Sequence, residues 1–208
     1  MGGTGLTIAA ISMMRCLDGV GIAAFRRHWL DVHGPLVCSF AGLRRYAQCH
    51  VIDTAATNQA ARALGIDGFP ILYFDHDADR GLAHGSAAMA ACNIDSRLFI
   101  GAVSRVITEP VELIPPASSR GRLSAIVLCP GGRDAAAMDD GLRAVPRLRG
   151  LTRYDVREQG PAPASTVPYL PVTVAGVFQL WFDSLIDLEA AMAGCEAPVF
   201  AVEEHWLV

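Results

Sequence analysis

The strongest chemical signal in the sequence is the pairing of Trp29 with His33, one helical turn apart, directly before Gly34-Pro35. Apolar residues recur at helical spacing through segment 22–36, which predicts an amphipathic helix. Proline disfavours helical conformation in the residue before it, so we expect the helix to end here with His33 at a rim. Imidazole changes its charge near neutral pH. His33 is therefore our candidate general acid/base, and the alternative is that it only caps the helix dipole.

A second set of polar side chains alternates along the expected strand 43–52. Successive strand residues point to opposite faces, so Tyr46, Gln48 and His50 share one face. The other face carries small and aliphatic residues, which suit packing against helices. We therefore expect Tyr46, Gln48 and His50 to line a cavity, where Tyr46 and His50 would position or polarise a substrate oxygen and Gln48 would contact the substrate.

The sequence also contains an internal repeat. The string Gly42-Leu-Arg-Arg-Tyr46 returns as Gly150-Leu-Thr-Arg-Tyr154, 108 residues later, and the same offset carries Leu72-Tyr-Phe-Asp75 onto Leu180-Trp-Phe-Asp183. Two matches at one offset indicate a duplication. By this correspondence we expect the cavity to be lined by aromatic side chains from both copies; the alternative is a barrel core filled by those side chains. The predicted substrate-binding residues are Trp29, Gln48, Tyr73, Tyr154 and Trp181.

Each copy is expected to have the order β-α-β-β-α-β, the ferredoxin-like pattern. A four-stranded sheet with helices on one face must bury its other face, and two copies in one chain can cover each other. The predicted fold class is α+β: two tandem ferredoxin-like units that form an intramolecular α+β barrel with a cavity between the sheets. The expected units are residues 1–114 and 122–208, joined by a Pro- and Ser-containing linker at 115–121, with a helix at 79–91 in the first unit.

Composition excludes several kinds of function. The net charge of −4 gives no electrostatic footprint for nucleic acid, and the chain has no Lys for Schiff-base or P-loop chemistry. No long apolar stretch predicts a membrane span, and the first ten residues do not resemble a signal peptide, so we expect a cytoplasmic protein with its six Cys reduced. No metal site is expected, because His28 and His33 would diverge by about 140° on an α-helix.

The motifs Trp29-Leu-Asp-Val-His-Gly-Pro-Leu36 and Gly42-Leu-Arg-Arg-Tyr46 resemble those of the EthD family, in the dimeric α+β barrel superfamily. The resemblance covers about residues 6–113 well, and the second half more weakly because it lacks the His-Gly-Pro element. The stretch around Val167-Pro-Tyr-Leu170 is similar to the methylmuconolactone methylisomerase family. That likeness implies an active-site role for His33, and the family likeness implies a barrel of two ferredoxin-like units.

These observations lead to one functional expectation and two alternatives. We expect a small cofactor-independent enzyme, of the isomerase or oxygenase type, that acts on an apolar cyclic or aromatic metabolite, with no cofactor. The first alternative is a non-catalytic binding or accessory protein of a degradation or polyketide pathway. The second, which rests on the superfamily resemblance, is a haem-binding protein with a His as axial ligand. Whether two chains pair in a homodimer is left open.

Overall fold

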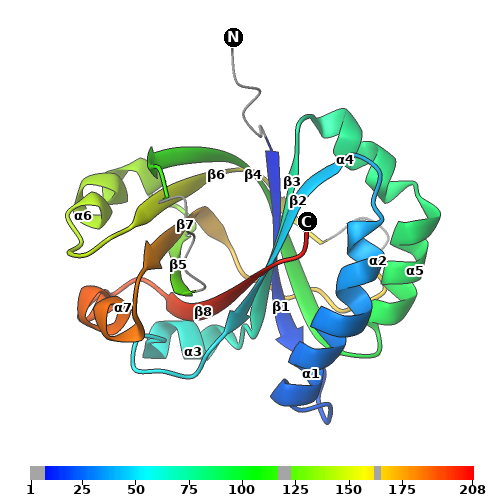
Figure 1. Cartoon of the computed structure of the whole chain (residues 1–208), viewed down its shortest axis with the longest axis horizontal. Helices are drawn as coiled ribbons and strands as arrows, with labels where there is room; N and C mark the ends of the chain where they lie inside the picture. The colour runs from blue at the N-terminus through cyan, green and yellow to red at the C-terminus, as the bar shows by residue number, and fades with distance from the viewer. Residues whose placement is uncertain (1–7, 117–122, 162–164) are drawn as a thin grey trace.

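The computed structural model describes residues 8–116, 123–161 and 165–208. Its strands form one closed antiparallel barrel with helices outside it (Figure 1). Most of the expected linker 115–121 and the first seven residues lie outside the described residues. The strands are β1 (Ile8–Cys16), β2 (Leu43–Val51), β3 (Gly68–Phe74), β4 (Ile100–Ile114), β5 (Leu123–Pro130), β6 (Gly150–Gly160), β7 (Val174–Phe182) and β8 (Val199–Trp206).

The strand order around the barrel is β1-β3-β2-β8-β5-β7-β6-β4. Read within each half, it gives β4-β1-β3-β2 and β8-β5-β7-β6, which is the same ferredoxin-like order twice. The halves join edge to edge, because β2 pairs with β8 and β4 pairs with β6. This arrangement confirms the predicted fold class. Closure also removes the free strand edges that each half would expose alone.

Side chains fill the interior of the barrel. The largest apolar cluster joins residues of both halves, including Phe69, Tyr154 and Phe200, and most of its members are fully buried. The expected cavity between the sheets is therefore replaced by a packed core, which was the alternative left open by the sequence. Short α3 (Gln59–Leu64) contributes Ala61 to the same cluster and packs at one end of the barrel (Figure 1).

Helices cover the outer face of each half. Over the first half lie α1 (Ile22–His28), η1 (Trp29–His33), α2 (Gly34–Cys38), α4 (Asp77–His84) and α5 (Ala87–Ser96); over the second lie η2 (Ala135–Met138), α6 (Asp139–Arg143) and α7 (Leu185–Met192). The expected helix 79–91 is two helices, because Ser86 caps a new one by accepting from the Met89 N–H at 3.1 Å. Among the described residues, no helix is long and apolar enough to cross a membrane.

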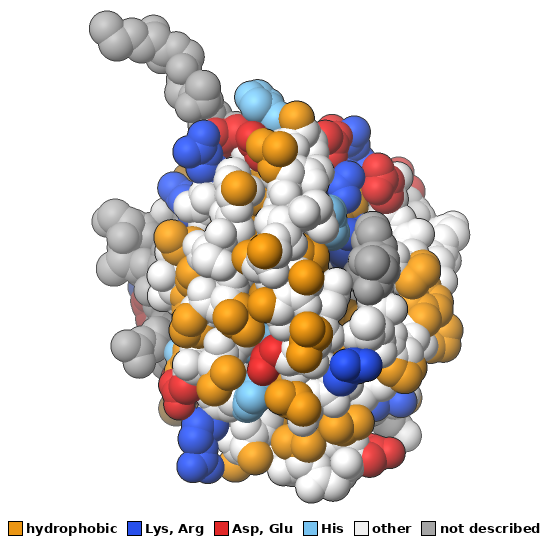
Figure 2. Space-filling view, turned by 90° about the vertical axis from the view of Figure 1, so that its right-hand side faces the viewer, with side chains coloured by type: hydrophobic (Ala, Val, Ile, Leu, Met, Phe, Trp, Pro, Cys, Tyr) orange, Lys and Arg blue, Asp and Glu red, His pale blue; other side chains and the backbone are white. Residues whose placement is uncertain are grey.

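Figure 2 looks onto the helical layer of the first half and shows hydrophobic side chains spread over it. Leu82, Ile94 and Leu98, on α4 and at or just beyond α5, are each more than 60% exposed. Beneath this layer, Val37, Phe40 and Tyr46 form a buried cluster against the sheet. A single layer of helices therefore separates the outer sheet face of the first half from solvent.

A β-bulge changes which residues of β2 face these helices. The pairing of β2 with β3 shifts register between Leu43 and Arg45. A shift of one residue sends every following side chain to the opposite face. Tyr46, like Leu43, therefore packs under the helices, whereas Cys49 points into the barrel. The expectation that Tyr46, Gln48 and His50 face the barrel interior was wrong for this reason.

The helix that carries His33 does not end at Gly34-Pro35 as expected. Pro35 has no N–H to donate and its ring would clash with the Asp31 carbonyl in a regular α-helix. The chain widens into the π-helical turn η1, in which the Gly34 N–H donates to the Trp29 carbonyl five residues back. With this wider turn the helix continues past the proline as α2 to Cys38.

Close packing under η1 predicts a large effect of a small substitution. A Cβ added at Gly68 in β3 would lie 2.4 Å from Cζ3 of the Trp29 indole, so Gly68→Ala should lower the free energy of unfolding by about 1–3 kcal/mol. Gly81→Ala is the control, because Gly81 lies within α4 and nothing lies within 4 Å of its added Cβ. Urea unfolding should show the control unchanged or more stable. Equal effects of the two substitutions would contradict the described packing.

Candidate active site

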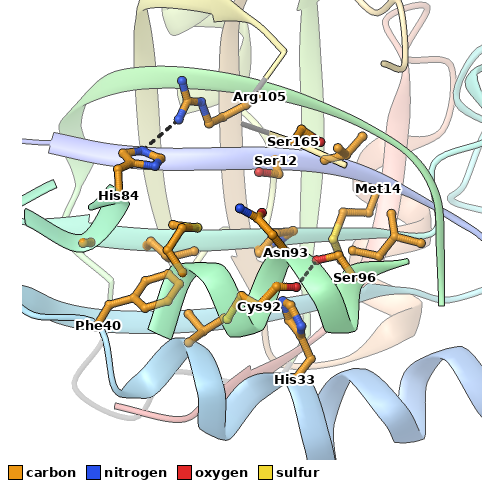
Figure 3. Close-up of a pocket in the computed structure, with 18 of the residues that line it drawn as sticks. Ser12, Met14, His33, Phe40, His84, Cys92, Asn93, Ser96, Arg105 and Ser165 are labelled. Carbon is orange, nitrogen blue, oxygen red and sulfur yellow. Dashed lines mark hydrogen bonds between the residues drawn. The ribbon is translucent and has the colours of Figure 1, made fainter. Parts of the chain in front are cut away.

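A cavity of about 140 Å³ lies between the outer face of the first-half sheet and the helices that cover it. Figure 3 shows side chains from β1, η1, α4, α5 and β4 around it. Most of its wall is apolar, with side chains such as Leu72, Phe74 and Met89. An apolar protein cavity of about 150 Å³ holds one benzene ring, so a space of this size suits a ligand of about one ring.

His33 lies in this cavity with its ring held by a carboxylate. His33 Nδ1 is 2.8 Å from Oδ2 of Asp95, which lies on α5, and both side chains are buried. The other carboxylate oxygen, Oδ1, is 2.9 Å from Nε2 of His28. Asp95 therefore accepts one hydrogen bond from each of two imidazoles. This partner of His33 was not found from the sequence.

The π-helical turn explains why two histidines five residues apart reach one carboxylate. In an α-helix, positions five apart diverge by about 140°. The wider turn of η1, with its hydrogen bond between residues five apart, brings such positions closer to the same side of the helix. His28 and His33 consequently point to the same side, toward α5. The expected divergence of these two residues does not occur.

The surroundings of His33 keep its ring neutral and fix its tautomer. Burial lowers the pKa of His33 below its ordinary value, and the hydrogen bond and charge of Asp95 offset this only in part. Since Nδ1 donates to Asp95, Nε2 carries the free lone pair. His33 lines the cavity. A neutral imidazole oriented in this way can accept a proton from a ligand at neutral pH.

Trp29, Tyr46, Gln48 and His50 form a hydrogen-bonded network on the same side of the sheet. Trp29 Nε1 donates to the Tyr46 hydroxyl at 3.0 Å, and Gln48 Nε2 donates both to that hydroxyl at 3.1 Å and to the Trp29 carbonyl at 2.9 Å. His50 Nε2 donates to Gln48 Oε1 at 3.0 Å. Trp29 and Tyr46 line the cavity, whereas Gln48 and His50 lie behind them. The network therefore holds the turn that presents His33.

The surroundings of His50 indicate that it supports the site and does not transfer protons. Its ring stacks on the Trp29 indole with centroids 4.4 Å apart and an angle of 5° between the planes. Burial, with the nearby His205 and Arg26, lowers the pKa of His50 to about 3. Burial also raises the pKa of the Tyr46 hydroxyl. Both groups stay neutral over the usual range of pH, so neither is prepared for proton transfer as His33 is.

The remaining predicted binding residues lie on the other side of the sheet, inside the barrel. The Tyr73 hydroxyl lies 2.7 Å from that of Tyr154, which donates to Gln179 Oε1 at 3.1 Å. Trp181 Nε1 donates to Glu204 Oε2 at 3.3 Å, and Gln179 Nε2 donates to Glu204 Oε1 at 2.8 Å. These groups satisfy one another across both halves. Tyr73, Tyr154 and Trp181 are therefore not brought together with His33.

Several residues that line the cavity were not expected from the sequence. Ser12, Asn93 and Ser96 bring hydroxyl and amide groups to it, and Arg105 and His84 meet at its other side (Figure 3). Asn93 and Asp95 lie on α5, beyond the end of the expected helix 79–91. A continued helical stripe of Cys92, Asp95 and Phe99 could have indicated that this face is buried. Burial raises the pKa of the Cys92 thiol to about 12, so the thiol is protonated at neutral pH and is a poor nucleophile.

Comparison with family models gives one match, in the first half of the chain. Residues 17–101 match the EthD domain. The matched range lies in the first half of the chain and includes η1, Asp95 and most of the cavity wall. No curated protein sequence matches the chain significantly.

Solved structures of similar fold match nearly the whole chain. An anthrone oxidase-like protein has a TM-score of 0.61 at 8% identity and covers 97% of this chain and 93% of its own. Monooxygenase-like proteins from Fusobacterium nucleatum (TM-score 0.55, 4% identity, 96% and 92% covered) and Lactobacillus acidophilus (0.53, 8%, 98% and 96%) are similar too. At these identities the likeness shows the barrel fold alone.

The cavity does not fit the haem that the superfamily resemblance raised as an alternative. A macrocycle is far larger than the single ring that this volume holds. Among residues 8–116, 123–161 and 165–208, no group of three or more His, Cys, Asp or Glu side chains is arranged to hold a metal ion.

The lowered pKa of His50 predicts acid destabilisation. The unfolded chain takes up the His50 proton near pH 6.5, whereas the folded chain resists it down to about pH 3. The free energy of unfolding should therefore fall as pH drops below about 6.5, by up to ~1.4 kcal/mol per pH unit for this group.

The substitution His50→Gln, which keeps a side-chain donor, should make the decline of stability between pH 6 and pH 4 shallower. Exposed His76 provides the matched control, His76→Gln, which should leave the slope unchanged. Urea unfolding at a series of pH values measures both slopes. An unchanged slope in His50→Gln would show that His50 does not resist protonation in the folded chain.

Proposed function

We propose that the chain is a small cofactor-independent enzyme that moves a proton on an apolar cyclic metabolite, with His33 as general base and then general acid. The observation that carries this proposal is the buried pair of His33 Nδ1 and Asp95 Oδ2 at 2.8 Å, beside a one-ring cavity. A carboxylate that orients an imidazole and fixes its tautomer is a recurring arrangement in proton-transfer catalysis.

The chemistry that suits this arrangement is removal of a proton from a carbon next to a carbonyl group. His33 Nε2 would take the proton, and the C–H electron pair would move to the carbonyl oxygen as an enolate. Ser12 and Asn93 line the same cavity and can donate hydrogen bonds to that oxygen. Return of the proton from His33 to a different carbon would complete an isomerisation, with no atom gained or lost.

An isomerase-type reaction is preferred over an oxygenase-type one because His33 alone can carry the proton in both directions. The apolar walls, among them Val37, Phe40 and Leu72, would exclude water from the enolate. Trp29 and Tyr46 would contact the ring from the sheet side. Asp95 would act as a positioning residue, because it reaches the ligand only through His33.

The test is deuterium incorporation from D2O into a panel of small unsaturated lactones and quinones, followed by proton NMR together with product formation. His33→Ala should slow exchange by about 10²- to 10⁴-fold while binding is retained. Asp95→Asn should also slow exchange, because the asparagine amide can donate a hydrogen bond to Nδ1. This favours the tautomer with its proton on Nε2, which leaves no lone pair there to accept a proton from the ligand. His76→Ala is the matched control and should match the unsubstituted chain.

Exchange should fall on acidification as His33 takes up a proton, with a midpoint below the ordinary histidine value. Unchanged exchange in His33→Ala would remove the assigned role. Ligands that stabilise the fold without exchange or turnover in the unsubstituted chain would instead identify a binding protein.

A further inference from the structure

The cavity carries a second polar feature, on the far side from His33. Arg105 of β4 reaches the cavity and donates from Nη1 to Nε2 of His84 at 3.0 Å. Figure 3 shows these two side chains together and separated from His33 by the body of the cavity. His84 lies at the end of α4, so this contact ties that helix to the sheet. None of the chemistry described above uses Arg105.

Within the described residues, the guanidinium of Arg105 has no anionic partner of its own. Among the described parts of the chain, no carboxylate lies within 4.0 Å of its nitrogens, although other arginines around it are paired. The neighbouring Arg80 bonds to Asp77 at 3.3 Å and lies 3.8 Å from Glu158. Glu158 acts on Arg105 only from a greater distance.

His84 does not replace a counterion. Its Nε2 accepts from Arg105, which requires a neutral ring, and burial together with Arg105 and Arg80 lowers its pKa. Burial and the charge of Arg80 also lower the pKa of Arg105, which remains far above neutrality for a guanidinium. A partly buried cation without a counterion lowers the stability of the folded chain. A ligand anion would offset that cost.

We propose that Arg105 binds the carboxylate of the substrate, which is therefore a single-ring organic acid. This inference rests on the proposed function, because it assigns the substrate class of the same cavity. The Arg105 guanidinium would bind the carboxylate through charge-assisted hydrogen bonds, and a guanidinium presents parallel donors that match a carboxylate. The hydrogen bond to His84 would hold the guanidinium in place.

The arrangement also assigns the orientation of the ligand. With its carboxylate at Arg105, the ring would lie along the apolar wall formed by residues such as Leu72 and Met89. The opposite edge of the ring would then face His33, so the carbon that loses its proton is remote from the carboxylate. A cavity of about 140 Å³ accommodates one ring with a short substituent.

The test compares benzoate with benzamide, which have the same size and differ in charge, in an NMR titration that follows the indole N–H signal of Trp29, which also lines the cavity. The unsubstituted chain should bind benzoate about ten- to a hundredfold more tightly than benzamide, because hydrogen bonds to a charged group are stronger. Arg105→Gln should abolish the difference by weakening benzoate alone. Arg105→Lys keeps the charge but loses the parallel donors of the guanidinium, so it should retain part of the preference for benzoate.

Arg133→Gln is the matched control, because it removes the same charge from an exposed side chain in the second half. It should leave the preference for benzoate unchanged, and thermal unfolding verifies that all variants fold. Equal affinity for the two probes in the unsubstituted chain, or a preference that survives Arg105→Gln, would overturn the inference.

This experiment separates the inference from the proposed function, since binding is measured without turnover. His33→Ala should keep the preference for benzoate. If the preference for benzoate does not depend on Arg105 while exchange still depends on His33, only the substrate class is wrong. If exchange is independent of His33 while Arg105 selects benzoate, only the proton-transfer role is wrong.

Discussion

The Trp29 carbonyl oxygen accepts two hydrogen bonds, and the geometry of the candidate site depends on them. One comes from the Gly34 N–H in the widened turn and the other from the Gln48 side chain at 2.9 Å. The second bond needs a close approach of the helix to β2, since a Cβ at Gly34 would lie 2.9 Å from Gln48 Nε2. Together they hold the five-residue turn that brings His28 and His33 over Asp95. A regular helix at this place would turn the two imidazoles away from each other.

The sheet separates two tasks that both need buried polar groups. Inside the barrel, hydrogen bonds across the two halves link the side chains of Tyr73, Tyr154, Gln179 and Glu204. These polar groups therefore bond to one another within the core. Outside, under the helices, the polar groups of His33 and Arg105 face a space that side chains do not fill. Packing that is complete on one face and incomplete on the other is what makes the outer face the place for chemistry.

The fold could be predicted from the sequence because a repeat determines architecture without requiring exact boundaries. Two matches at one offset were enough to place two ferredoxin-like units in one barrel. The sheet face on which each β2 side chain lies could not be predicted. The bulge between Leu43 and Arg45 reverses the alternation, and no residue type in the sequence indicates a bulge there. Tyr46 and its repeat partner Tyr154 therefore lie on opposite faces of the sheet.

The candidate site was predicted in part for a related reason. His33, Trp29 and Tyr46 stand near one another in sequence-defined motifs, and the structure keeps them together. Asp95 and Arg105 reach the site from α5 and β4, at sequence distances where no spacing rule applies. The helix was expected to stop at Pro35 because propensity alone does not reveal that tertiary packing can support a π-helical turn.

The union of two unlike halves in one polypeptide has an evolutionary consequence. In an assembly of two identical units, every substitution appears twice, so a change that fills one hollow fills both. Here η2, α6 and α7 pack directly onto Phe178, Leu180 and Phe182, while the layer over the first half leaves room beneath it. Because each half mutates independently, selection can improve the packing of the second half, which supports the fold. The first half can meanwhile keep the unfilled space under its helices.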